Sequence, residues 1–316
     1  MKKTRRDFLK SSGLATAGFL VPSAILTACS SPSSSSSAAD SATTDSAVAD
    51  SASAGAAAGN LNDFGIQLWT VRDDLKKDPK GVLKQLSTFG FTQIESFEGE
   101  QGIFWGMGAK GFQEYTKSLN MTPISAHCDI NKDFEKKAAE AASIGMKYLI
   151  CPYLGAQKSL DDYKKAADTF NKRGEVCKKN GIRFAYHNHD YAFKKIEDQY
   201  PIDVFIKNTD PELVDFEMDL YWVVTAGADP KKFLADNKGR FKLVHVKDRA
   251  KDASHNDISV NESCVLGTGS INYPDILKAA KAEGVDYFIV EQERFNEGTP
   301  LECAKRDAEY MKTLSI

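Results

Sequence analysis

The sequence predicts an α/β fold of the (β/α)₈ TIM-barrel type, built as one domain. First, short apolar segments rich in β-branched and aromatic residues alternate eight times with amphipathic helical segments from residue 64 onward. Second, the region from Leu61 to Ile316 has about 256 residues, the usual size of one such barrel. Third, no Gly-rich dinucleotide-binding turn follows the first strand, which disfavours an open doubly wound sheet.

The strand candidates are near-continuous apolar runs, the pattern of a parallel sheet covered by helices. They are residues 64–71, 92–98, 122–128, 148–154, 183–190, 214–222, 241–248 and 287–293. Helical patterns lie between them, including 133–144, 160–180, 229–237, 274–283 and 301–314. Most follow an Asp, Ser or Asn that can cap a helix, and several end at a glycine: Gly90, Gly145, Gly181 and Gly284.

Residues 1–28 have the layout of an export signal, with the pair Arg5-Arg6 before a weakly apolar run. The pair resembles the signal read by the twin-arginine translocase. Residues 26–29 resemble a lipoprotein cleavage box, which makes Cys29 the expected lipidation site. The apolar run is too short and too polar to span a bilayer. We therefore expect an exported lipoprotein, anchored to a membrane of the periplasm or cell envelope.

Residues 29–60 are mainly Ser, Ala, Thr, Asp and Gly, and are expected to form a flexible tether before the barrel at 61–316. The whole chain carries a net charge of −3, and removal of the basic signal leaves about −7. This sign disfavours a nucleic-acid partner. A homo-oligomer is left open.

Five cysteines remain after Cys29. Their number is odd and no CxxC spacing occurs, so neither a disulfide framework nor a structural zinc site is indicated. We expect most of them to be buried as small hydrophobic residues. The long connection 249–270, which contains Gly267-Thr268-Gly269, is a candidate lid over the barrel mouth.

Ionisable residues gather at the predicted carboxyl ends of the strands, where barrel active sites are built. They are Glu95, His127, His187, His189, Glu217, Asp219, His245, Lys247, Glu291 and Glu293. Four of the five histidines fall in this set, and the fifth, His255, lies in the long loop. Residues two apart on a strand share a face, so four strands are expected to offer two polar groups each. The nitrogen and oxygen donors suit Mn²⁺, Zn²⁺, Mg²⁺ or Co²⁺.

The chain resembles the xylose isomerase-like TIM barrels, the sugar phosphate isomerase/epimerase family, over residues 61–316. The resemblance is strongest in 65–72, 186–190, 215–222, 245–248 and 290–292. It implies one divalent metal held by Asp219, His245 and Glu291, with His187 standing where many members have a strand-five Glu. His189 is the alternative strand-five ligand. Epimerases of this family use the strand-five and strand-eight Glu pair as acid and base, and this chain lacks one of the two.

The chemistry that such a site suits is proton abstraction next to a carbonyl through an enediolate, as in a sugar isomerase or epimerase. Glu291 or His189 is the candidate base, and Lys247 and His127 are candidates to stabilise or reprotonate oxygen. Substrate contacts are expected from Glu95, Trp69, Trp222 and Asn188. The substrate is expected to be a neutral sugar or keto-sugar, because no clear basic cluster is available for a phosphate.

Two other outcomes stay open. In the first, loss of a β-substituent from the same enediolate would make the protein a lyase or dehydratase on a keto-sugar or oxidised glycoside. In the second, the protein is a surface lipoprotein that binds sugar without turning it over. The related AP endonucleases need additional His and Asp ligands. Trp222 stands where they would have a histidine, three residues after Asp219, which disfavours that activity.

Overall fold

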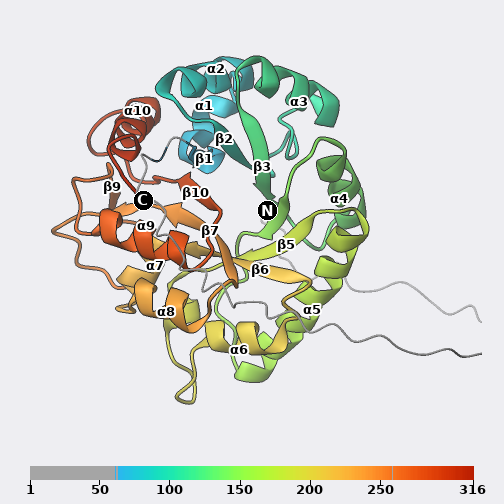
Figure 1. The fold of residues 1–316 in the computed structure, drawn as a ribbon, viewed down its shortest axis with the longest axis vertical. Helices are drawn as coiled ribbons and strands as arrows, with labels where there is room; N and C mark the ends of the chain where they lie inside the picture. The colour runs from blue at the N-terminus through green and yellow to red at the C-terminus, as the bar shows by residue number, and fades with distance from the viewer. Residues whose placement is uncertain (1–60, 62, 258) are drawn as a thin grey trace, which may run out of the picture. The chain divides into compact units, whose positions relative to one another are not determined.

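The computed structural model describes residues 61, 63–257 and 259–316, which form a closed barrel of parallel strands ringed by helices (Figure 1). Neighbouring strands follow the order β1-β2-β3-β4-β5-β6-β7-β10, and β10 pairs with β1 to close the barrel. The predicted fold class is confirmed. The predicted signal (1–28), the tether (29–60) and the lipidation site Cys29 lie outside the described residues. Within the described residues, no helix has the length and apolar character needed to cross a membrane.

The barrel strands and the helices alternate along the chain as predicted. The strands are β1 (Gly65–Gln67), β2 (Gln93–Phe97), β3 (Thr122–His127), β4 (Tyr148–Cys151), β5 (Arg183–His187), β6 (Val214–Asp219), β7 (Phe241–Val246) and β10 (Tyr287–Val290). The helices are η1 (Leu68–Val71), α1 (Arg72–Leu75), α2 (Pro79–Phe89), α3 (Gly108–Ser118), α4 (Phe134–Ser143), α5 (Leu160–Lys179), η2 (Asp190–Phe193), α6 (Pro201–Asn208), α7 (Leu220–Thr225), α8 (Pro230–Asp236), α9 (Tyr273–Ala282) and α10 (Pro300–Met311).

The helix ends follow the capping residues in the sequence. Ser159 accepts a hydrogen bond from the backbone of the first turn of α5, and Thr299 with Glu302 forms a capping box at the start of α10. The four glycines predicted to end helices all have positive φ, from 76° to 103°: Gly90, Gly145, Gly181 and Gly284. Only glycine adopts this left-handed backbone at little cost, which fixes where these helices stop.

Several strands end earlier than predicted, because the chain turns into a helix at once. The first strand was expected to reach Val71, but residues 68–71 form the 3-10 helix η1. The sixth was expected to reach Trp222, but the Asp219 side chain accepts a hydrogen bond from Trp222 N at 3.1 Å and begins α7. Apolar content alone cannot separate a buried strand from a buried helical turn, so these predicted ends are wrong.

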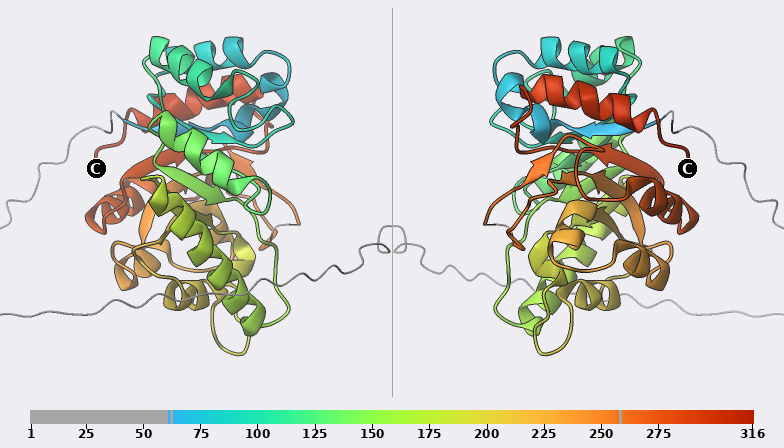
Figure 2. Two further views of the ribbon diagram at one scale, coloured as in Figure 1. Left: turned by 90° about the vertical axis from the view of Figure 1, so that its right-hand side faces the viewer. Right: turned by 90° about the vertical axis from the view of Figure 1, so that its left-hand side faces the viewer.

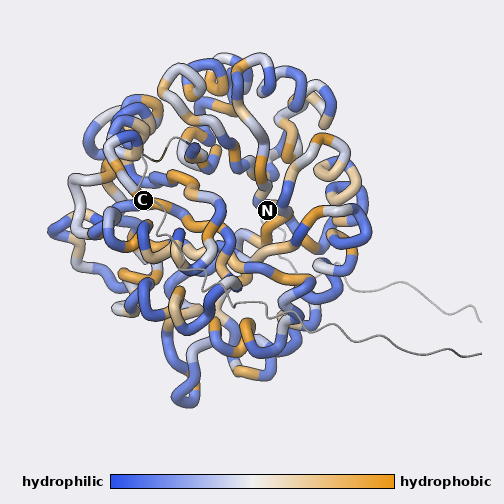
Figure 3. Tube along the Cα trace, viewed as in Figure 1, coloured by the Kyte–Doolittle hydropathy of each residue, from blue (hydrophilic) through white to orange (hydrophobic). Residues whose placement is uncertain are grey.

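The largest core combines buried residues of the barrel strands with buried residues of the helices that surround the barrel (Figure 2). Along these helices hydrophobic and hydrophilic residues alternate (Figure 3). A small separate cluster fills the barrel interior: Tyr148, Ile150, Ala185 and Leu243. The predicted burial of the cysteines is confirmed for Cys128, Cys151, Cys177, Cys264 and Cys303, which are all free. This packing leaves the carboxyl ends of the strands as the place where polar groups collect.

The predicted lid, 249–270, is tied to the barrel at its base. Its short strands β8 (Asp248–Arg249) and β9 (Ser263–Cys264) pair antiparallel. The Asp248 carboxylate accepts hydrogen bonds from the backbone of Gly267 and Gly269 at 2.9 and 3.0 Å. Farther along, Asn261 donates to Glu293 at 2.9 Å. The loop therefore reaches the rim of the barrel mouth through Asn261.

Asp307 on α10 makes stability depend on pH. One oxygen accepts a hydrogen bond from Leu266 N at 2.8 Å, the other has no partner, and burial raises the pKa to about 8. Between about pH 4 and 8 the folded state keeps a proton that the unfolded state has released, so the free energy of unfolding falls as pH rises. Asp307→Asn should remove this fall and raise the melting temperature at pH 8. The control is Glu309→Gln, at an exposed position of the same helix; a lower melting temperature at both pH 5 and pH 8 for Asp307→Asn would contradict the assignment.

Candidate metal centre

The predicted gathering of ionisable side chains occurs at the carboxyl-terminal mouth of the barrel. Glu217 and Asp219 both belong to β6 and share its inner face. In the other predicted pairs the second residue lies beyond its strand, as with His189 after β5 and Lys247 after β7. Lys247 still turns inward, with its Nζ 3.2 Å from Glu291 Oε2 and 3.5 Å from Asp219 Oδ2. The chain path after each strand, rather than strand alternation, brings these groups inward.

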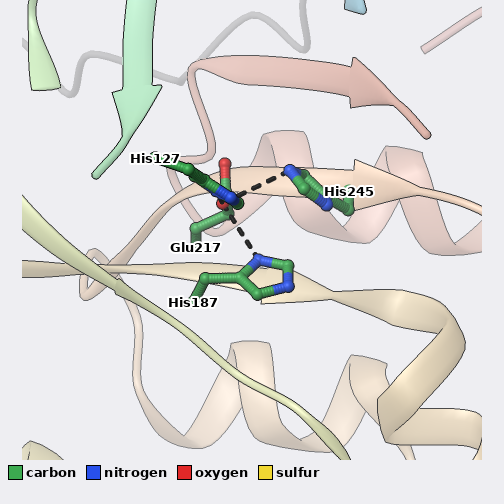
Figure 4. Close-up of side chains that lie close together, drawn as sticks. All are labelled: His127, His187, Glu217 and His245. Carbon is green, nitrogen blue, oxygen red and sulfur yellow. Dashed lines mark hydrogen bonds and ion pairs between the residues drawn. The ribbon is translucent and has the colours of Figure 1, made fainter. Parts of the chain in front are cut away.

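The Glu217 cluster consists of Glu217 and three imidazoles, which surround its carboxylate in Figure 4. Glu217 Oε2 lies 2.8 Å from His127 Nε2, 3.0 Å from His187 Nδ1 and 3.3 Å from His245 Nε2. Glu217 is fully buried, and its Oε1 has no hydrogen-bond partner. Burial and the charge of Glu95 raise the pKa of Glu217 to about 7. One oxygen therefore orients three rings.

Glu95 lies against the Glu217 cluster and is also fully buried. Its Oε1 lies 2.6 Å from His245 Nε2 and 3.1 Å from His127 Nε2. Burial alone would lower the pKa of His127, but the charge of Glu95 and the contact with Glu217 raise it to about 9. His127 is therefore a cation at neutral pH.

The Asp219 cluster consists of Asp219, His245 and Glu291. His245 Nδ1 lies 3.4 Å from Glu291 Oε2 and 3.9 Å from Asp219 Oδ2. His187 Nε2 adds a fourth donor, 3.7 Å from Asp219 Oδ2. Atoms that bind one ion at about 2.0–2.2 Å lie roughly 3 to 3.5 Å apart, close to this spacing. The structure thus groups three of the predicted ligands, Asp219, His245 and Glu291, and places the fourth, His187, beside Asp219.

Two buried atoms of the Asp219 cluster, Asp219 Oδ2 and His245 Nδ1, have no hydrogen-bond partner. An unpaired buried polar atom is costly unless it has a ligand. Burial raises the pKa of Asp219 to about 6, which marks a carboxylate without enough compensating positive charge. The donor set and these two atoms fit a divalent cation.

Each histidine of the donor set has a carboxylate on its other ring nitrogen. His245 donates Nε2–H toward Glu95, and His187 donates Nδ1–H toward Glu217. With a metal bound, these contacts would leave Nδ1 of His245 and Nε2 of His187 free of hydrogen on the side of Asp219. Histidines that bind metals commonly have such a carboxylate partner, which fixes the tautomer and the ring orientation.

A pocket of about 350 Å³ opens beside this centre. Its lining includes four predicted site residues, Trp69, His127, His189 and Glu291, together with the predicted ligand His187. Burial and the charge of Lys247 lower the pKa of His189 to about 3, so that its ring is neutral. Its Nδ1 has no hydrogen-bond partner. His189 therefore lines the pocket with a neutral ring whose Nδ1 is buried.

Three residues predicted to hold the substrate do not line the pocket: Glu95, Asn188 and Trp222. Glu95 holds histidine rings. The Asn188 side chain bonds the backbone N–H and C=O of Asp219 at 3.1 and 3.3 Å. Trp222 is 2% exposed and stacks on His189 with ring centroids 5.6 Å apart. All three contact other site residues, and their expected role in substrate binding stays a prediction.

The sequence interpretation missed pocket residues that follow β2, β3 and β4. They are Phe97, Glu98, Cys128, Asp129, Pro152 and Tyr153. Tyr153 is neutral and lies just beyond β4, so the pattern of ionisable groups at strand ends did not include it. Glu217 was noticed as a polar strand end but received no role. Its signal was the spacing of two residues from Asp219 on one face.

Comparison with known proteins places these features in a family. Residues 51–314 match the family model described as "Xylose isomerase-like TIM barrel". The inosose dehydratase of Mesomycoplasma hyopneumoniae (strain J) is 29% identical over 280 residues, covering 82% of this chain and 87% of that protein. The match to the inosose dehydratase of Clostridium perfringens spans about half of that relative, 54% of its length, at 27% identity.

Solved structures agree with this placement. A sugar phosphate isomerase/epimerase from Parabacteroides distasonis superposes with a TM-score of 0.67 at 28% identity, over 84% of this chain and 97% of that one. A xylose isomerase-like TIM barrel protein from Mycobacterium smegmatis, solved in complex with magnesium, has a TM-score of 0.57 at 17% identity, over 80% of this chain and 96% of that one. The latter shows the likeness of fold alone. On the match that spans nearly all of the barrel, this chain belongs to the xylose isomerase-like TIM barrel family.

Proposed function

We propose that this chain is a divalent-metal-dependent enzyme that removes the proton next to the carbonyl of a keto-sugar and expels a β-hydroxyl group as water. The observation that carries the proposal is the close grouping of Asp219, His245 and Glu291, from β6, β7 and the end of β10, with His187 from β5 beside Asp219. When bound, Mn²⁺, Zn²⁺, Mg²⁺ or Co²⁺ would act as a Lewis acid that polarises the substrate carbonyl.

The residues that would move protons lie at the pocket beside this donor set. His189 lines the pocket with a neutral ring, and it is the candidate to accept the proton from the carbon next to the carbonyl. His127 is protonated, and its Nε2 contacts Glu95 and Glu217, which leaves Nδ1–H to protonate the departing hydroxyl. The carbon–oxygen bond breaks as the carbon–carbon double bond forms, and the products are an unsaturated ketone and water. Lys247 and Glu291 stay paired beside the substrate oxygens.

Two observations favour elimination over isomerisation. The sequence relatives that match are named inosose dehydratase, and the strand-five Glu of the epimerase pair is replaced by His187. Isomerisation or epimerisation is the second candidate, because the solved relative from Parabacteroides distasonis at 28% identity is named sugar phosphate isomerase/epimerase. Both reactions share the first proton transfer.

The test is incubation of the protein with inosose and keto-hexoses in deuterated water, with and without metal. We expect metal-dependent absorbance of an unsaturated ketone, and a loss of rate of about 10²- to 10⁴-fold in His189→Ala. Deuterium in an otherwise unchanged carbon skeleton, with no water lost, would assign the isomerase outcome instead. Sugar binding that is unchanged after chelation, without any exchange, would identify a non-catalytic sugar-binding protein and overturn the proposal.

We further infer that the chain is exported and held at a membrane by lipid on Cys29, which rests on the residues of its first 29 positions. Cys29→Ala is expected to move the protein from the membrane fraction to the soluble fraction, because the lipid would then be absent. Ser30→Ala is the control. Mass spectrometry of an unmodified N-terminal segment in the membrane-bound wild-type protein would contradict the lipid anchor.

A further inference from the structure

The pocket extends well beyond the residues that would touch a reacting carbonyl. On one side lie His187, His189 and Glu291, next to the donor set. On the far side the lining comes from the ends of β1 to β4 and contains none of the four metal donors. That side is formed by Trp69, Phe97, Glu98, Cys128, Asp129, Pro152 and Tyr153.

The far side presents two exposed aromatic rings. Among the described residues, the large hydrophobic side chains that are exposed are Trp69 at 41%, Tyr153 at 55% and Val260 at 37%. Two of the three therefore face this one pocket. Exposed aromatic surface in a concave site marks a binding surface, because it gains most when a ligand covers it.

Both rings are held in place before any ligand arrives. Trp69 donates its Nε1–H to Glu293 at 3.3 Å and packs edge-on against Phe97, with ring centroids 5.0 Å apart. Tyr153 packs edge-on against His189 and Tyr191, at 5.0 and 5.8 Å. Fixed rings lose little entropy when a flat ligand covers them.

The pocket lining has four carboxylates and one protonated histidine, His127, so its net charge disfavours anions. No lysine or arginine lines the pocket, whereas Glu98, Asp129, Glu291 and Glu293 do. Glu98 Oε2 accepts from Lys137, and Asp129 Oδ1 accepts from Asn131 N. Among the described residues, no hydrogen bond occupies Glu98 Oε1 or Asp129 Oδ2. These oxygens can accept hydrogen bonds from hydroxyl groups, and they would repel a phosphate.

From the aromatic rings and the acidic rim we infer that the far side of the pocket binds a second, uncharged sugar ring, so that the substrate is a neutral glycoside. The apolar face of that ring lies against Trp69 and Tyr153, and its hydroxyl groups reach Glu98 and Asp129. The inference rests on the proposed function only in placing the reacting ring at the metal side. A neutral glycoside substrate would distinguish this protein from enzymes that act on phosphorylated sugars.

The test is calorimetric binding to the metal-loaded protein of glucose, glucose 6-phosphate, phenyl glucoside and a panel of neutral disaccharides (cellobiose, maltose, trehalose and sophorose). We expect at least one disaccharide to bind about tenfold more tightly than glucose, and glucose 6-phosphate to bind more weakly than glucose. Failure of every disaccharide to exceed glucose would overturn the inference, as would tighter binding of the phosphate ester. Phenyl glucoside binding as tightly as the best disaccharide would show that the second group is not recognised as a sugar.

Single variants test whether Trp69 and Tyr153 are the residues that bind the second sugar ring. Trp69→Ala and Tyr153→Ala should each reduce affinity for the best disaccharide about tenfold. Val260→Ala, which also removes an exposed hydrophobic side chain but lies outside the pocket lining, should not change it. Unchanged disaccharide affinity in both aromatic variants would overturn the assignment. Because binding is measured without turnover, a protein that binds disaccharides but shows no proton exchange would refute the proposed reaction and leave this inference intact.

Discussion

Asp219→Asn is expected to lower affinity for the divalent metal by more than about 100-fold and to abolish turnover. Replacement of a residue that only supports a metal ligand costs roughly 10- to 100-fold, and Asp219 supplies a donor oxygen itself. Its Oδ2 has no hydrogen-bond partner and faces His245 Nδ1 and Glu291 Oε2. An amide brings no charge to that position. Metal content after dialysis and competition with a chelating dye would measure the loss.

The same substitution should stabilise the metal-free protein at pH 8. Burial raises the pKa of Asp219 to about 6, so above that pH the folded state holds a carboxylate that would be more stable in water. The neutral amide removes this cost. An increase in the melting temperature without metal, together with lost metal binding, is the expected signature of a functional residue.

Asp229→Asn provides a matched control, because both aspartates cap short helices. Asp219 accepts from Trp222 N at the start of α7, and Asp229 accepts from Lys231 N and Lys232 N at the start of α8. Asparagine caps about as well as aspartate. The control should therefore keep metal affinity. Equal loss in both variants would mean that helix capping, not ligation, explains the result.

The sequence was sufficient to predict the barrel because its signals repeat along the chain. Apolar strand runs recurred eight times, and capping residues and four helix-ending glycines marked helix ends between them. Local consistency of that kind specifies a fold. Strand ends were harder to predict. The apolar run after Asp219 continues through Trp222 into a buried helix, and nothing in its composition separates strand from helix.

The donor residues were predictable and the shape of the pocket was not. His245 and Glu291 were placed from motifs at strand ends. The pocket depends on loop paths after β2, β3 and β4, which place Phe97, Asp129 and Tyr153 together. The conformation of these loops depends on packing between residues far apart in the sequence, so local sequence patterns do not predict it.

Glu217 is expected to support metal binding by orienting His187, which occupies strand five. His187 needs a proton on Nδ1 to present a bare Nε2 to the metal, and Glu217 Oε2 accepts that proton's hydrogen bond at 3.0 Å. The same oxygen contacts His127 and His245. Glu217→Gln should therefore cost about 10- to 100-fold in metal affinity, because an amide oxygen without charge orients the three rings more weakly.

A double-mutant cycle tests this dependence. His187→Glu supplies the acidic side chain that many family members have, but it sets a second buried carboxylate against Glu217, and like charges there should repel and weaken both folding and metal binding. In the double variant His187→Glu/Glu217→Gln, the introduced amide can donate to the introduced carboxylate, so metal affinity should partly return. We expect a coupling of about 1 to 3 kcal/mol between the two sites, read from metal affinity and from the melting temperature without metal. If the losses of metal affinity in the two single variants simply add in the double variant, Glu217 does not act through His187. The Glu217 carboxylate would then have a role in the barrel that does not depend on His187.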